Sequence, residues 1–297
     1  MATLADGHSH PPTTMTQDLD LGGIQVSPVL GGRLWLDGGA MFGVVPRTLW
    51  ERQCPPDGRH RIENACNCLL IRSGDHLVLI ESGCGDRFLE RERELFAVDE
   101  TATLVTALAS VGIDPTQITH VILTHLHFDH SGGLLMAQGG QLFARFSEAQ
   151  HFVQHGEWLD AVSGRSIMRS SYLTDDLTAM ASELQWNHLS GDTEVVPGVE
   201  VRVTKGHTEH HQSVVVRGSE RTLVYPGDLI PTRHHLRPYW IMSYDMFPFD
   251  TFQQKRKLCD EAAAEDWILS WDHDPDQVFS TLSSPKPGQF EAVRYES

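Results

Sequence analysis

The chain has 297 residues, of which 40% are hydrophobic, and a mean hydropathy of −0.27, which is typical of a globular protein with a sizeable core. The net charge of −17, without any run of Lys or Arg, argues against nucleic acid and anionic membranes as partners, because both would repel the chain. No stretch is long and apolar enough to span a bilayer, so we expect no membrane partner.

The N-terminal residues 1–20 are polar, and Pro11-Pro12 with several threonines predicts a flexible lead. This lead has no apolar segment, and no basic residue precedes Arg33, so we expect no secretory signal. His8 and His10 are two residues apart, but no strand precedes them and we assign them no metal role. Residues 21–297 contain no repeat and no linker, which predicts a single domain.

The next segment combines strand-like alternation with glycines. Residues 24–35 alternate loosely and predict one or two strands, broken at Gly31-Gly32. Residues 37–46 are rich in glycine and apolar side chains and predict a loop. Two interpretations of this loop remain open: a pocket wall that presents Met41 and Phe42, or a turn packed over the core. An apolar loop of this kind also suits a homodimer interface.

A hairpin and a crossover are predicted next. Residues 68–71 and 77–80 are apolar and flank Ser73-Gly74-Asp75, which predicts two paired strands. Residues 99–110 have helical spacing and end before Gly112, and residues 119–123 read as a buried strand. Strand, helix and strand of these lengths predict an α/β crossover unit.

The five cysteines are an odd number and lack the density of a disulfide scaffold, which predicts a reduced, cytoplasmic protein. They are Cys54, Cys66, Cys68, Cys84 and Cys259. For Cys66 and Cys68, two residues apart in a predicted strand, small buried side chains are favoured over a second metal pair.

The strand at 119–123 runs directly into a cluster of metal-type ligands: His125, His127, Asp129 and His130 lie within six positions. Alternate side chains of an extended chain share a face, so His125 and His127 can reach one ion, while His130 points elsewhere. One short loop can thus serve two adjacent ions. Imidazole with carboxylate suits zinc, manganese or iron. A His-rich surface loop or a single structural metal is the weaker interpretation.

Three further candidate ligands each follow a predicted strand. His207 follows residues 199–204, Asp228 follows 222–226, and His273 follows 267–270. In the long stretch between, residues 141–143 and 150–153 predict strands, residues 156–162 and 173–184 predict helices, and another helix is predicted over 250–264. His151 and His155 are interpreted as ordinary polar positions.

The string His-x-His-x-Asp-His, followed in order by these later ligands, resembles the metallo-β-lactamase superfamily of binuclear metallohydrolases, from about Cys68 to His273. The resemblance implies an α/β fold, a four-layer αββα sandwich of two mixed sheets. It implies that His125, His127 and His207 hold one divalent ion, that Asp129, His130 and His273 hold a second, and that Asp228 bridges them. Zinc is favoured, with manganese, cobalt or iron compatible.

In the implied chemistry, a hydroxide bridging the two ions attacks an electrophilic carbonyl carbon or phosphorus. The catalytic residues would be Asp228, as bridging ligand, and Asp129, as proton shuttle. Relatives usually have Asp-Thr-Gly after the second hairpin strand, where this chain has Glu81-Ser82-Gly83. Glu81 keeps the carboxylate and is expected to orient a ligand histidine, a role for which Asp86 is an alternative.

The ligand set also discriminates within the family. His127 differs from the carboxylate of diiron oxidoreductases, Asp228 differs from the cysteine of true β-lactamases, and the acidic charge disfavours the nucleases. We favour a lactonase acting on acyl-homoserine lactones. A phosphotriesterase or arylesterase, a thioesterase of the glyoxalase II type, and a metal-bearing sensor without turnover remain alternatives. Known lactonases have a tyrosine three positions after the bridging aspartate, where this chain has Pro231.

The segment after Asp228 is rich in aromatic residues and is predicted to face a small-molecule substrate. Together with the earlier apolar loop, it gives the candidate substrate-binding residues Met41, Phe42, Tyr239, Trp240, Met242 and Tyr244. Tyr239 or Tyr244 is a candidate for the hydroxyl that Pro231 cannot supply.

Overall fold

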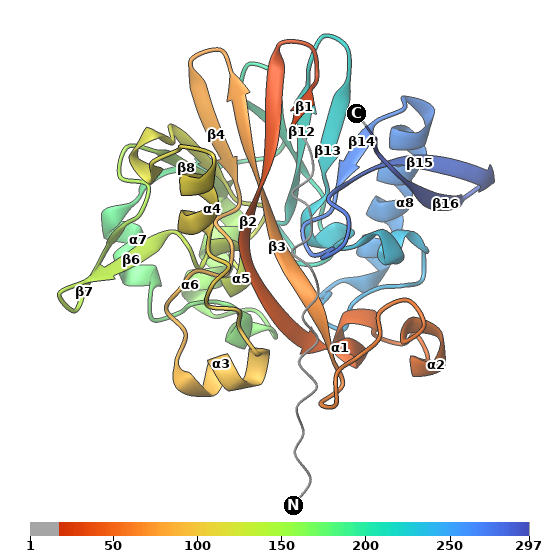
Figure 1. The fold of residues 1–297 in the computed structure, drawn as a ribbon, viewed down its shortest axis with the longest axis horizontal. Coiled ribbons are helices and arrows are strands. Elements are labelled where there is room, and N and C mark those ends of the chain that lie inside the picture. Colours follow the sequence, from red (N-terminus) through yellow and green to blue (C-terminus); the bar gives the residue numbers. More distant parts are fainter. Residues whose placement is uncertain (1–17, 297) are drawn as a thin grey trace, which may run out of the picture.

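The computed structural model describes residues 18–296 and places two seven-stranded sheets face to face, with helices on their outer faces (Figure 1). This is the αββα sandwich that the sequence predicts, so the fold class is confirmed. The residues that line the interface between the sheets are apolar in both. Leu69 and Ile71 of the first sheet share one buried cluster with Val214 and Val216 of the second.

The first sheet is mixed. In spatial order its strands are Leu19–Asp20 (β1), Ile24–Asp37 (β2), Arg61–Ser73 (β3), His76–Ile80 (β4), His120–Ile122 (β5), Gln150–Gln154 (β8) and Gln185–Leu189 (β9). Pairing is antiparallel from β1 to β4 and parallel from β4 to β9. A small hairpin, Leu135–Gln138 (β6) with Gln141–Ala144 (β7), lies outside this sheet.

The second sheet is antiparallel except at one pair. Its strands are Thr193–Val196 (β10), Val199–Val203 (β11), Gln212–Arg217 (β12), Thr222–Tyr225 (β13), Ile268–Ser270 (β14), Phe279–Lys286 (β15) and Gln289–Arg294 (β16). The exception is β13 with β14, which run parallel because the long helix α8 connects them.

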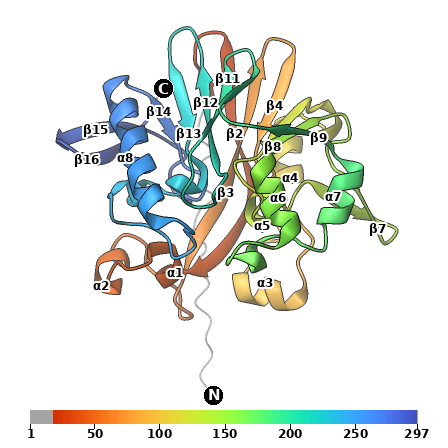
Figure 2. The same cartoon turned by 180° about the vertical axis from the view of Figure 1, so that it is seen from behind.

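Helices cover the outer faces of both sheets (Figure 2). The α-helices are Gly38–Phe42 (α1), Arg47–Trp50 (α2), Glu90–Phe96 (α3), Leu104–Ser110 (α4), Phe128–Ser131 (α5), His155–Ser163 (α6), Leu177–Glu183 (α7) and Pro248–Ala264 (α8). The 3-10 turns are Pro115–Gln117 (η1), Arg169–Ser171 (η2), Gly227–Leu229 (η3) and Arg233–Leu236 (η4). Side chains of α4, α6 and α7 pack on the first sheet, and those of α8 pack on the second.

Several elements differ from the sequence predictions. Residues 24–37 form one strand, because a register shift between Leu30 and Arg33 absorbs the two glycines without breaking the pairing. The predicted loop at 37–46 contains helix α1, whose first turn is capped by the Asp37 side chain, which accepts from the Ala40 amide. The helix predicted over 99–110 begins only at Leu104, after the cap Thr103.

At the N-terminus, Leu19 and Asp20 pair with β2, so the last residues of the predicted flexible lead belong to the sheet. His8 and His10 lie outside the described residues. All five cysteines are free. Within residues 18–296, no helix combines the length and apolarity needed to cross a bilayer.

Candidate metal centre

The structure gathers all seven side chains that the sequence suggests as ligands: His125, His127, Asp129, His130, His207, Asp228 and His273. They follow β5 in the first sheet and β11, β13 and β14 in the second. Because β4 and β5 run parallel, as do β13 and β14, the chain leaves neighbouring strands at the same edge. These edges of the two sheets lie side by side, so the loops that carry the ligands meet there.

One cluster contains the ligand atoms of His125, His127, His207 and Asp228, all within 4.8 Å of one another. Nε2 of His207 lies 3.0 Å from Nδ1 of His127 and 3.0 Å from Oδ2 of Asp228. Three imidazoles and a carboxylate at this separation form the kind of nitrogen and oxygen set that zinc accepts.

The second cluster contains His130, Asp228, Asp272 and His273. Asp228 therefore belongs to both clusters, as expected for a bridging carboxylate. Asp129 lies beside this second cluster, with Oδ2 at 3.6 Å from Nε2 of His273 and Oδ1 at 3.8 Å from Nε2 of His130. It leaves the extended alternation of His125 and His127 because residues 128–131 form the helical turn α5.

Several polar atoms of the centre lack hydrogen-bond partners among the described residues, and this observation tests whether the residues fit a metal. His125 Nε2, His127 Nε2, His130 Nε2 and Asp228 Oδ1 are buried and have no hydrogen-bond partner among the described residues. A buried polar atom without a partner costs about 1–3 kcal/mol, and natural proteins rarely keep several together. Divalent cations bound to these nitrogen and oxygen atoms would take the place of the missing hydrogen bonds, so the residues fit the metal ions that the sequence implies.

The electrostatics of the centre favour a cation as well. Burial and neighbouring imidazoles lower the pKa of His125 and His127 well below 6.5, so both rings are neutral, the form that binds metal. Burial also opposes protonation of His207 and His273, but surrounding carboxylates raise the pKa of each ring to about 10. Without ions, the centre therefore holds protons that a bound cation would displace.

Asp245 is a part of the site that sequence reasoning missed. It lies in the segment between η4 and α8, is buried, and accepts a hydrogen bond from Nδ1 of His207 at 2.9 Å. This contact fixes the ring and leaves Nε2 pointing into the cluster. Nothing in the local sequence marks Asp245, because its partner is 38 positions away.

We expect Asp245→Asn to lower the affinity for divalent metal by about 10- to 100-fold, the usual effect of removing a carboxylate that orients a ligand histidine. The affinity is measured by competition with a chromogenic chelator. Asp260→Asn, an exposed aspartate on α8, is the matched control. Equal affinities of both variants and the wild type would contradict the role assigned to the contact.

The two carboxylates proposed for the same orienting role differ in position. Glu81 is buried, accepts from the Thr124 amide at 2.9 Å, and lies 3.5 Å from Nδ1 of His130. Asp86 instead pairs with Arg145 at 2.9 Å and its side chain is 44% exposed. Of the two carboxylates, Glu81 is the one that lies near a ligand histidine, and Asp86 forms a surface ion pair.

His210 and His211, which follow His207 closely, also occupy different environments. His211 is fully buried, with its ring 5.4 Å from that of His125, and its Nδ1 lies 3.0 Å from the Thr204 hydroxyl. His210 lies 3.8 Å from Asp160 near the surface. His151, interpreted from the sequence as an ordinary polar position, is buried, and both of its ring nitrogens lack hydrogen-bond partners among the described residues.

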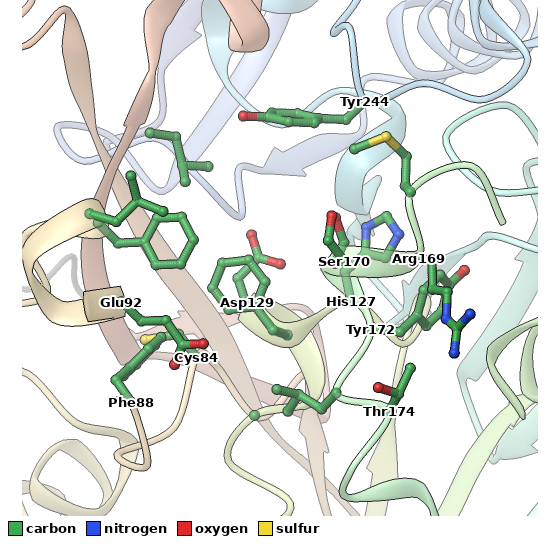
Figure 3. A pocket seen from close by; sticks show the side chains of 18 of the residues that line it. Cys84, Phe88, Glu92, His127, Asp129, Arg169, Ser170, Tyr172, Thr174 and Tyr244 are labelled. Atoms are coloured by element: carbon green, nitrogen blue, oxygen red, sulfur yellow. The ribbon is translucent and has the colours of Figure 1, made fainter. Parts of the chain in front are cut away.

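A cavity of about 1360 Å³ opens over the two clusters. Its floor includes His127, Asp129 and Asp228, and Figure 3 shows Tyr244 and Tyr172 on the surrounding walls. Of the six predicted substrate-binding residues, three line this cavity: Met41, Met242 and Tyr244.

The other three predicted substrate residues lie elsewhere. Phe42 is fully buried and stacks between Trp50 and His235, with ring centroids 5.6 and 4.8 Å away. Trp240 packs edge-on against Phe42 beneath the cavity. Tyr239 is 74% exposed and stacks on Phe252. The prediction was wrong for Phe42 and Trp240 because an apolar segment does not reveal which side chains turn toward the core, and wrong for Tyr239 because its ring lies on the surface against Phe252.

Sequence reasoning also missed much of the cavity wall. Apolar side chains complete it: Phe88 just before α3, Phe96 of α3, Phe128 of α5, and Ile167 and Leu173 on either side of η2. Apart from Phe128, which lies inside the His-x-His-x-Asp-His string, these residues carry no motif, and they line the cavity because α3 and η2 fold back over the end of the sheets.

Comparison with known proteins places this geometry in context. A family model described as the metallo-beta-lactamase superfamily matches residues 61–273. An N-acyl homoserine lactonase of Bacillus thuringiensis is 27% identical over 236 residues, covering 74% of this chain and 85% of the relative. An N-acyl homoserine lactonase of Bacillus cereus is 28% identical over 167 residues, which span 53% of this chain and only 60% of the relative.

Among solved structures, a probable metal-dependent hydrolase from Staphylococcus aureus superposes with a TM-score of 0.84 at 28% identity. The match covers 94% of this chain and 99% of the other. The similarity therefore extends over nearly the whole chain, including both sheets.

Proposed function

The chain belongs to the metallo-beta-lactamase superfamily, and from this premise we propose that it is a two-metal hydrolase that opens the ring of N-acyl homoserine lactones. The family and its lactonase relatives indicate a metal-dependent hydrolase. The observation that carries the finer proposal is the pair of buried ligand clusters that share Asp228 beneath an open cavity.

In this proposal His125, His127 and His207 hold one divalent ion, and Asp129, His130 and His273 hold the other, with Asp228 common to both. Zinc is favoured because imidazole and carboxylate ligands dominate, although manganese, cobalt and iron accept similar sets. When bound, such ions polarise a carbonyl oxygen and make water acidic enough to ionise near neutral pH.

Asp129 is suited to move a proton at this centre. Its carboxylate lines the cavity and lies within 4 Å of both His130 and His273. It is 8% exposed, so it can receive a proton from the reacting water and pass it to the alkoxide released when the ring opens. Neither step needs a serine or cysteine nucleophile.

The cavity wall suits an acyl chain. Phe88, Phe96 and Phe128 form a contiguous aromatic surface, with the Phe96 and Phe128 rings stacked at 5.2 Å. At the rim, Leu95 and Ile167 are large apolar residues that remain 53% and 80% exposed. An acyl chain extending from the metal centre toward solvent would cover this surface, and each buried methylene would contribute about 0.8 kcal/mol.

A substrate panel tests the proposal. Metal-loaded protein is followed by pH-stat with lactones of different acyl length, aryl esters, thioesters and phosphotriesters. We expect turnover of N-acyl homoserine lactones, with efficiency rising with acyl length. If only phosphotriesters or only thioesters are turned over, the lactonase proposal is wrong and the protein is a phosphotriesterase or a thioesterase. Bound metal without turnover of any substrate would favour a sensor.

We expect Tyr244→Phe to lower kcat on lactones by about 100-fold, with a smaller change in KM. Burial and the nearby carboxylate of Asp129 raise the pKa of the Tyr244 hydroxyl, so it stays protonated and can donate to the reacting oxygen. Steady-state kinetics measure the effect. Tyr239→Phe, on the exposed surface, is the control, and an equal loss in both variants would refute the assignment.

A further inference from the structure

Glu157 is the most deeply buried carboxylate that the proposed chemistry does not use. It lies in the first turn of α6, is fully buried, and faces the metal-binding edge of the sheets. A carboxylate in such a position is stable only if donors compensate for its lost hydration. Three donors do so, and each belongs to a segment that shapes the first ligand cluster.

The first donor is the backbone amide of Leu126, which lies 3.1 Å from Oε1 of Glu157. Leu126 is the residue between His125 and His127, so this contact anchors the loop that supplies two ligands from the first sheet. The second donor is the Thr208 hydroxyl, 2.7 Å from Oε2. Thr208 directly follows His207, the ligand from the second sheet.

The third donor is the Tyr172 hydroxyl, 3.0 Å from Oε1. Tyr172 also contacts the cluster directly, because its ring packs edge-on against His127 with centroids 4.8 Å apart, and the two backbones form an isolated bridge. Figure 3 shows His127 and Tyr172 on the same wall of the cavity. One carboxylate therefore holds three segments that are distant in the sequence.

We propose that Glu157 is a positioning residue for the first metal site, holding the His125–His127 loop and the His207 loop at the separation that one ion requires. This inference rests on the metal placement in the proposed function, but not on the lactone substrate. Glu157 acts through the protein: its two oxygens are occupied by the three donors. Its loss would let the two loops move independently, although each ligand would remain.

The test separates hydrogen bonding from simple burial. Glu157→Met keeps the length of the side chain but accepts no hydrogen bond, so the Leu126 amide loses its partner. Glu157→Gln keeps an acceptor for Leu126 and Tyr172, and its amide can donate to Thr208 once that hydroxyl turns. Glu183→Gln, an exposed glutamate at the end of α7, is the matched control.

The main readout is the affinity of each ion, measured by titrating metal-free protein with Zn²⁺ against a chromogenic chelator. Glu157→Met is expected to weaken the first site about 10- to 100-fold. Glu157→Gln is expected to stay within about fivefold of the wild type, because the contacts are largely retained. A Co²⁺ absorption spectrum reports the ligand geometry and is expected to change only in Glu157→Met.

Thr208 provides a second test that does not depend on the folding of Glu157→Met. Thr208→Val removes one donor at constant shape and is expected to weaken the first site several-fold, whereas Thr208→Ser keeps the hydroxyl and is expected to match the wild type. Equal affinities in Thr208→Val and Thr208→Ser would overturn the proposal. The proposal would also be overturned if Glu157→Gln bound metal as weakly as Glu157→Met, because the effect would then come from the lost negative charge and not from the lost hydrogen bonds.

The outcome is distinguishable from failure of the proposed function. If the wild type binds two ions and Glu157→Met binds them equally well, only the role of Glu157 is lost. If the wild type binds both ions and opens no lactone, the substrate proposal fails while the affinity measurements still decide the role of Glu157.

Discussion

Asp228→Ala is expected to lower hydrolytic activity by more than about 100-fold and to reduce bound metal from the proposed two ions per chain to fewer than one. The expected loss of activity exceeds the 10- to 100-fold loss typical of replacing a residue that only orients a ligand, because the Asp228 carboxylate belongs to both clusters. The variant would also place three buried imidazoles, those of His130, His207 and His273, close together without the carboxylate that now lies within 3.6 Å of each.

Elemental analysis of dialysed protein measures the metal content, and the substrate panel measures the activity. Asp260→Ala, an exposed position on α8, controls for the loss of a negative charge. An Asp228→Ala protein that retained two ions would contradict the shared position of this carboxylate and, with it, the two-metal proposal.

Lys255→Met is expected to destabilise the protein by about 3 kcal/mol. Lys255 is 1% exposed, and its ammonium donates to the carbonyl oxygens of His235, Arg237 and Trp240 at 2.9, 3.2 and 2.8 Å. Methionine fills the same space but leaves three buried carbonyls without this donor, at about 1 kcal/mol or more each. The same segment continues to Asp245, so metal affinity is expected to fall as well.

Chemical denaturation of the metal-free protein measures this change, and Lys257→Met, an exposed lysine on the same helix, is the control. A loss of stability in Lys255→Met no larger than in Lys257→Met would show that the three carbonyls find other partners.

The pH dependence gives a second signature of Lys255. Burial lowers the pKa of its ammonium from 10.5 to about 8 in the folded protein. Between these values the unfolded chain binds the proton more tightly, so this residue makes stability rise as the pH increases from about 8 to 10.5. We expect the difference in stability between wild type and Lys255→Met to grow over this window, and a flat difference would contradict the burial of the charge.

The sequence predicts the parts of the fold and site that local pattern encodes. His125, His127 and His130 are recognisable because they lie within six positions after an apolar strand. His207, Asp228 and His273 are single residues at strand ends, and they are recognisable only because the resembling superfamily has ligands at such positions in this order. The αββα arrangement is predicted only through the resemblance to the superfamily, and in the structure it lets the apolar faces of the two sheets bury each other.

What the sequence could not predict depends on contacts between distant segments. Glu157, Asp245 and Lys255 look like ordinary polar residues, and their roles arise from partners 15 to 51 positions away. Phe42 was assigned to the substrate pocket because its loop is apolar, yet its ring is enclosed by side chains from residues 50, 235 and 240. Such packing is a property of the tertiary structure.

The ligands of each cluster are divided between the two sheets, and this division has a consequence for how the sheets separate. His125 and His127 come from one half of the sandwich, and His207 and Asp228 from the other. A cation held by both halves acts as a cross-link, and it is fully coordinated only while the halves stay docked. Bound metal would therefore resist separation of the two sheets, and metal-loaded protein is expected to withstand more denaturant than the metal-free protein.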